Sequence, residues 1–125
     1  MSDRVIKILT IAFIWLATVL LFTAGDYFVH SLSPVWSVPE YYFSHKIIYG
    51  WLWGVAGLLL ARWFSSLWLK ALVLSGVVVI ALQVRYFVEG YPLDFVLWFL
   101  LFHFIILYVL TIAMFWIFNR AKINY

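Results

Sequence analysis

The sequence predicts an all-α integral membrane protein, a single-domain bundle of four transmembrane helices. Composition is the first reason: the 125 residues are 68% hydrophobic and 10% charged, whereas soluble domains average about 45–50% apolar and about 25% charged residues. A soluble chain of this size would expose much of its Leu, Phe and Trp to water and aggregate. The second reason is that the apolar residues form continuous runs, which favours helices over alternating barrel strands.

The first two runs occupy residues 5–24 and 38–63. A hydrocarbon core about 30 Å thick needs about 20 residues of helix. The first helix can continue to residue 32, where a Ser-Pro pair follows. The second reaches a full span if Ser37 is its N-cap, because Ser37 and Glu40 have the spacing of a capping box.

The third and fourth helices are predicted at residues 71–88 and 92–118. Gly90 is typical of the position just past a helix end, and Pro92 is typical of a first turn. The short segment between them makes these helices antiparallel neighbours. Between the second and third helices, residues 62–70 form a Trp-containing loop that we expect to lie in the membrane interface.

The basic residues predict the orientation. Six of the eight Lys and Arg residues lie at one end of the helices, which are Arg4, Lys7, Arg62, Lys70, Arg120 and Lys122. The positive-inside rule therefore places both termini on the inner side of a multi-pass protein of the cytoplasmic membrane. In such a protein the excess of basic residues is a topology signal, so no nucleic-acid partner is expected.

Small residues mark one face of the second helix, at Gly50, Gly54, Gly57 and Ala61. Their spacing of three and four lets another backbone approach closely. This face is interpreted as packing within the bundle, with the seam of a homo-oligomer as the alternative.

Most acids and imidazoles fall at the outer end of the predicted bundle. Asp26 and His30 are four residues apart and share a face if the first helix continues past Gly25. His45 lies near the start of the second helix, within reach if the first two helices pack together. Carboxylate and imidazole ligands without any cysteine suit zinc, iron or copper. These three residues therefore form the predicted metal site, with hydrogen bonding among them as the alternative.

Two further acids are weaker candidates for this site. Glu40 has a structural explanation in the capping box, and it shares no helical face with His45. Asp94 lies in the first turn of the fourth helix, where a carboxylate favours the positive end of the helix dipole.

Four other polar residues are expected to bind substrate or to hold helices together. Arg85 and Glu89 are four apart and can pair, and Arg85 can also hold an anionic substrate group. His103 lies deep in the fourth helix, with Gln83 at a similar depth as its expected hydrogen-bond partner. Such a pair can fasten two helices or take part in proton or ligand binding.

The Asp26-x3-His30 pair followed by His45 resembles the copper-ligand arrangement in a membrane subunit of particulate methane and ammonia monooxygenases. The resemblance covers these three residues. The interval between His30 and His45 differs from that of the monooxygenase subunit, and this chain is far shorter than that subunit. An open coordination position on a metal bound by these residues would allow hydrolysis or redox chemistry on a small or lipid-soluble substrate.

Two non-enzymatic functions stand beside the metal site. The first is an accessory or scaffold subunit of a larger membrane complex, favoured by the aromatic surface and the small-residue face. The second is a small oligomeric transporter, because four helices in about this length resemble the small multidrug resistance family. That family depends on a Glu in its first helix, whereas no acid lies within residues 5–24 here.

Overall fold

The protein is all-helical. A computed structural model describes residues 1–125, with a 3-10 turn, η1, after the first helix. The elements are α1 (Asp3–Ser31), η1 (Pro34–Trp36), α2 (Tyr41–Ala61), α3 (Leu67–Val88) and α4 (Leu93–Arg120).

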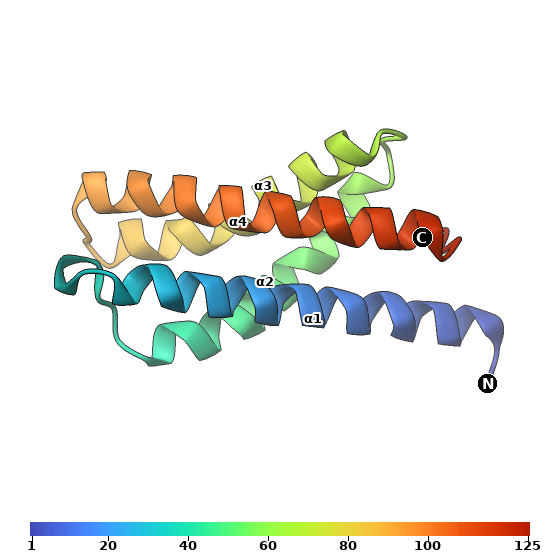
Figure 1. Cartoon of the computed structure of the whole chain (residues 1–125), viewed down its shortest axis with the longest axis horizontal. Coiled ribbons are helices and arrows are strands. Elements are labelled where there is room, and N and C mark those ends of the chain that lie inside the picture. Colours follow the sequence, from blue (N-terminus) through green and yellow to red (C-terminus); the bar gives the residue numbers. More distant parts are fainter.

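The four helices close into a bundle. Each helix packs against the next one in the chain, and α1 also packs against α4. In Figure 1, α1 and α4 run antiparallel and side by side, α2 crosses obliquely, and both termini lie at the same end. The η1 turn and the α3–α4 connection therefore lie together at the opposite end.

Three helices, α1, α3 and α4, are long and apolar enough to cross a membrane. The prediction of four spans is thus supported for three of them. The second helix, α2, falls short by composition because its first two turns carry Tyr41, Ser44, His45 and Lys46.

Burial follows the pattern expected of a protein surrounded by lipid. Only 31 of 125 residues are buried, and large apolar side chains cover the outside, with Phe13, Phe87 and Trp98 each more than half exposed. Several polar side chains lie inside instead, and Asp26 and His103 are completely buried. Soluble proteins show the opposite distribution of charged residues.

The connection between α1 and α2 differs from the prediction. α1 continues to Ser31, so Asp26 and His30 lie on the same helix. The predicted capping box does not form: Ser37 ends η1 in an extended conformation, and α2 begins at Tyr41. Glu40 occupies the N-cap of α2 but makes no side-chain capping bond. The Ser-Pro pair explains this, because Pro34 starts η1 and Ser37, the predicted cap of the second helix, instead ends η1 with its N–H bonded to the Pro34 carbonyl.

The ends of α3 are set by local signals. Ser66 precedes its first residue, Leu67, so the connection from α2 is shorter than the predicted loop at 62–70. At the other end Gly90 has a φ of 82°, and the Tyr91 N–H donates to the Tyr86 carbonyl at 3.1 Å. This bond closes a Schellman turn of the kind that favours glycine at this position.

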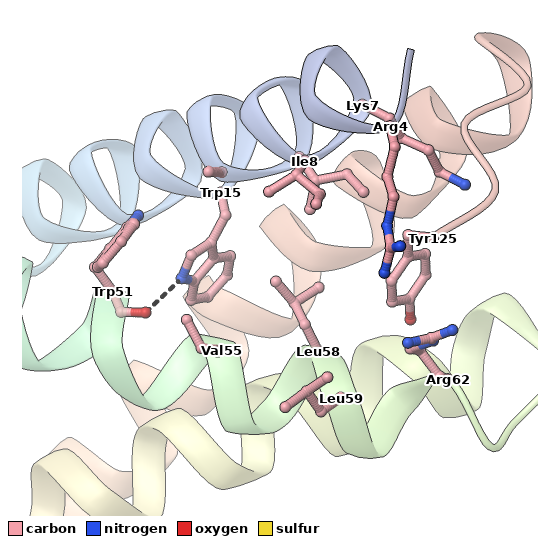
Figure 2. Close-up of a pocket in the computed structure, with 12 residues that line it drawn as sticks. Arg4, Lys7, Ile8, Trp15, Trp51, Val55, Leu58, Leu59, Arg62 and Tyr125 are labelled. Atoms are coloured by element: carbon pink, nitrogen blue, oxygen red, sulfur yellow. Dashed lines mark hydrogen bonds between the residues drawn. The ribbon is translucent and has the colours of Figure 1, made fainter. Parts of the chain in front are cut away.

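The small-residue face of α2 packs inside the bundle. A Cβ on Gly54 would lie 2.0 Å from the Trp15 indole nitrogen, and one on Gly57 would lie 2.7 Å from Leu74. The same indole N–H donates to the Trp51 carbonyl at 3.2 Å (Figure 2). The missing side chain at Gly54 is therefore what lets Trp15 of α1 lie flat against α2.

We predict that Gly54→Ala destabilises the bundle by about 1–3 kcal/mol, because the added methyl group overpacks the Trp15 contact. Unfolding in mixed micelles by a denaturing detergent measures this change. Gly76→Ala in α3 is the matched control, since a Cβ there meets nothing within 4 Å. It should be neutral or stabilising by about 0.5–1 kcal/mol. Equal effects of the two substitutions would contradict the packing assigned to Gly54.

Candidate metal centre

Polar side chains from all four helices meet inside the bundle. We call them the buried polar cluster; none is more than 4% exposed. Its members are Asp26 and His30 of α1, Lys46 of α2, Gln83 and Tyr86 of α3, and His103 of α4.

Asp26 lies at the centre of the buried polar cluster. Its Oδ1 atom is 2.5 Å from Nε2 of His103 and 3.3 Å from Nε2 of His30. Its Oδ2 atom accepts a hydrogen bond from the Lys46 ammonium group. His30 reaches the carboxylate because it lies one helical turn after Asp26, on the same face of α1.

The outer nitrogen of each histidine is held by an oxygen that can only accept. Nδ1 of His30 is 2.5 Å from the Trp36 carbonyl oxygen, so this nitrogen carries the proton and donates. Nδ1 of His103 donates in the same way to Oε1 of Gln83 at 3.0 Å. The Gln83 amide is oriented by its own N–H bond to the Val96 carbonyl, at 2.6 Å. Both rings therefore direct Nε2 toward Asp26.

Besides Lys46, this arrangement requires a proton or a metal ion between Asp26 and His103. Nε2 of His30 can accept from the Lys46 ammonium group, 3.2 Å away. Nε2 of His103 has only the Asp26 carboxylate as a hydrogen-bond partner. A neutral imidazole with its proton on Nδ1 would present a lone pair to that carboxylate, and the two acceptors would repel each other. A proton or a metal ion has to lie between them.

Three of these residues have the composition of a metal site. One ligand atom each from Asp26, His30 and His103 lies within 4.8 Å of the other two. Two imidazoles and one carboxylate form a frequent ligand set of catalytic zinc, and three protein ligands leave one coordination position for water or substrate. The Trp36 carbonyl and Gln83 also match the outer-shell acceptors that usually orient metal-binding histidines.

Lys46 opposes a metal ion at this position. Its ammonium group neutralises Asp26 and lies 5.2 Å from the ring centres of Phe43 and Tyr86, over their faces. A divalent ion bound to Nε2 of His30 would have to displace this ammonium group from that nitrogen. Metal binding and the Lys46 charge therefore compete.

Aromatic rings enclose the buried polar cluster. The His30 ring stacks on Phe99 with centroids 4.0 Å apart, and Phe22 meets the His103 ring edge-on at 5.5 Å. Two clefts reach the edge of the buried polar cluster. One, of about 220 Å³, is lined by His30 and Glu40 among others, and the second, of about 360 Å³, is lined by Lys46 and Tyr86.

Of the three predicted ligands, the structure brings Asp26 and His30 together but not His45. Nδ1 of His45 accepts a hydrogen bond from the Arg85 guanidinium at 2.6 Å, on the side of α2 that faces α3. Consecutive residues on a helix point about 100° apart. Lys46 therefore points into the bundle while His45 points to its rim.

Of the other candidates, Gln83 and His103 belong to the buried polar cluster, whereas the remaining four lie outside it. Glu40 and Asp94 are exposed, and Asp94 lies in the first turn of α4 as expected. Arg85 and Glu89 form an exposed ion pair of 3.0 Å. Gln83 and His103 form the expected hydrogen bond, but His103 also reaches Asp26.

Sequence reasoning missed Lys46 as the counterion of Asp26, and it missed the contact between Asp26 and His103. The positions of Asp26 and Lys46 along their helices could have predicted the contact between them. Asp26 and Lys46 both lie about one and a half turns from the connection between their helices. Antiparallel neighbours place such residues at the same level of the bundle.

We predict that Lys46→Met destabilises the metal-free protein by about 3–5 kcal/mol, because it leaves the buried Asp26 carboxylate without its counterion. Unfolding in mixed micelles provides the measurement. The double variant Asp26→Asn/Lys46→Met should be more stable than Lys46→Met alone. Lys7→Met is the control, since Lys7 is exposed and forms no ion pair, and it should stay within about 0.5 kcal/mol of the parent protein. Equal stability of Lys46→Met and Lys7→Met would contradict the ion pair.

The predicted copper-like set of Asp26, His30 and His45 is not assembled, because His45 lies against Arg85. Comparison with known proteins gives no matching family model, no matching curated protein and no matching solved structure.

Proposed function

We propose that the chain is a four-helix membrane protein with both termini on the inner side, in which α2 is the remaining span. Three observations support this topology. α2 packs against both α1 and α3, and the two termini lie at the same end of the bundle (Figure 1). The polar residue that most lowers the hydropathy of α2, Lys46, is buried against Asp26 rather than facing lipid.

We further propose that Asp26, His30 and His103 bind a divalent transition metal, with zinc, iron and copper as the chemical candidates. One observation carries this proposal: both Nε2 atoms are directed at Asp26 Oδ1, while both Nδ1 atoms are held by oxygen acceptors. A metal ion in this position would replace the proton shared by Asp26 and His103. Binding should therefore release a proton and strengthen as the pH rises.

The proposed chemistry is a metal-assisted reaction on a small or lipid-soluble substrate. Three protein ligands leave a coordination position for water or substrate. The cleft lined by Lys46 and Tyr86 leads to the buried polar cluster from between α2 and α3. Arg85 lines the same cleft, where its charge suits an anionic group on the substrate.

One observation favours a second function. Lys46 already compensates the Asp26 charge, so the buried polar cluster can exist as a metal-free network that fixes the positions of four helices. In that case the protein is a non-catalytic subunit of a membrane complex. The two functions differ in how Zn²⁺ affects the stability of the Lys46→Met variant, since only a metal site lets Zn²⁺ replace the lost positive charge.

We predict that detergent-purified protein, stripped with a chelator and titrated with Zn²⁺, binds one ion per chain. His30→Ala and His103→Ala should each weaken binding by at least about ten-fold. Lys46→Met should bind more tightly than the parent protein and regain stability on adding Zn²⁺. Isothermal titration and elemental analysis measure binding.

His45→Ala is the matched control, because this imidazole lies at the rim of α2 and outside the proposed ligand set. It should bind Zn²⁺ like the parent protein. Gln83→Leu keeps all three ligands but removes the acceptor of His103, and should weaken binding by about 10–100-fold. The metal site is refuted if the parent protein binds no ion, or if His45→Ala loses as much affinity as His103→Ala.

The topology proposal predicts that cysteines introduced at Ser2 and Asn124 are labelled from the same side of the membrane. A membrane-impermeant thiol reagent applied to intact cells and to inverted vesicles provides the measurement, and the protein has no native cysteine to interfere. A cysteine at Ser65, between α2 and α3, should share their accessibility. Labelling of Ser2 and Ser65 positions from opposite sides would show that α2 does not cross.

A further inference from the structure

A groove lies at the end of the bundle that contains the termini, far from the buried polar cluster. It has a volume of about 380 Å³, which falls in the range of ligand pockets. Most of its lining is apolar and comes from α1 and α2, including Ile8, Val55, Leu58 and Leu59. Trp15 and Trp51 lie at its inner end (Figure 2).

The charged residues of this groove are all basic. Arg4 and Lys7 of α1 and Arg62, at the end of α2, line it, and no acid does. None of the three forms an ion pair within the chain. The groove thus combines an apolar lining with three basic side chains that form no ion pair in the chain.

Tyr125 adds a directed polar group. Its hydroxyl oxygen is buried but has no hydrogen-bond partner. Figure 2 shows its ring beside the Arg4 and Arg62 side chains, at the end of the groove away from the tryptophans. Burial raises the pKa of Tyr125 to about 12, although Arg62 lowers it, so the hydroxyl keeps its proton and can donate to an anion.

The segment after α4 places Tyr125 by a defined turn. Lys122 has a φ of 54°, and the Ile123 N–H donates to the Phe118 carbonyl at 2.8 Å. This is a Schellman turn, which reverses the chain after the helix. Beyond it the Tyr125 ring packs on Phe115 at 5.6 Å, so the hydroxyl is held at the groove rather than left on a mobile tail.

We propose that this groove binds one anionic phospholipid, with its phosphate held by Arg4, Arg62 and Tyr125 and one acyl chain lying along α1 and α2. Charge complementarity selects this ligand, because the groove places basic side chains and the unpartnered Tyr125 hydroxyl next to an apolar lining. Basic pockets between helices at the inner side of membrane proteins bind acidic lipid headgroups for the same reason. The site is independent of the metal proposal.

The experiment uses native mass spectrometry of the detergent-purified full chain with added lipid. The probes are phosphatidylglycerol and phosphatidylcholine with identical acyl chains. We expect one phosphatidylglycerol per chain to be retained in preference to phosphatidylcholine. Arg62→Gln should reduce its affinity by about five-fold, and Tyr125→Phe should reduce it without changing the net charge.

Two further variants separate this site from general attraction of acidic lipid. Arg120→Gln removes the same charge at the same end of the bundle, but Arg120 lies outside the groove, over Trp116. It should leave the affinity unchanged. Val55→Trp fills the apolar floor while keeping every charge, and should abolish retention.

Three results would overturn the proposal. Equal retention of the two lipids would remove the charge selectivity, and equal effects of Arg62→Gln and Arg120→Gln would show only diffuse attraction. Competition by millimolar inorganic phosphate, together with unchanged retention in Val55→Trp, would show a phosphate site without a lipid. Circular dichroism of each variant confirms that the helices are intact.

Discussion

The ion pair between Asp26 and Lys46 is the constraint on which the interior of this protein depends. An isolated charge of either sign would be costly inside an apolar bundle, and each residue supplies the compensation that the other needs. The pair joins α1 to α2, and the histidines that complete the contacts of Asp26 extend the network to α4. One carboxylate thus links α1, α2 and α4, and Gln83, which accepts from His103, extends the network to α3.

The same pair explains the unusual composition of α2. By hydropathy this helix does not match the other three, because it carries Lys46 and several weakly polar residues. Its lysine faces inward and its glycines replace bulky side chains where Trp15 of α1 lies against it. Internal charge compensation accounts for the lysine of α2 and close packing accounts for its glycines, while its outer side still exposes apolar residues such as Ile48, Leu52 and Leu59.

The two ends of the bundle have different chemistry. At the end with the connection between α3 and α4, the side chains of the buried polar cluster face inward and bind one another, so that this end can hold a cation between Asp26 and His103. At the end with the termini, Arg4 and Arg62 line an open groove and have no acidic partner in the chain. One end therefore suits a buried cation and the other suits an anion from the membrane.

Composition and local spacing already predicted the helical class, the apolar surface, the turn at Gly90 after α3, and a shared face for Asp26 and His30 if α1 continues past Gly25. These follow from composition or from residues within one turn of each other. The sequence by itself could not decide that His103 and Lys46, rather than His45, meet Asp26, nor that η1 replaces the predicted cap at Ser37. Those outcomes depend on how each helix is rotated and at what level it meets its neighbours, which is set by contacts between residues far apart in the chain.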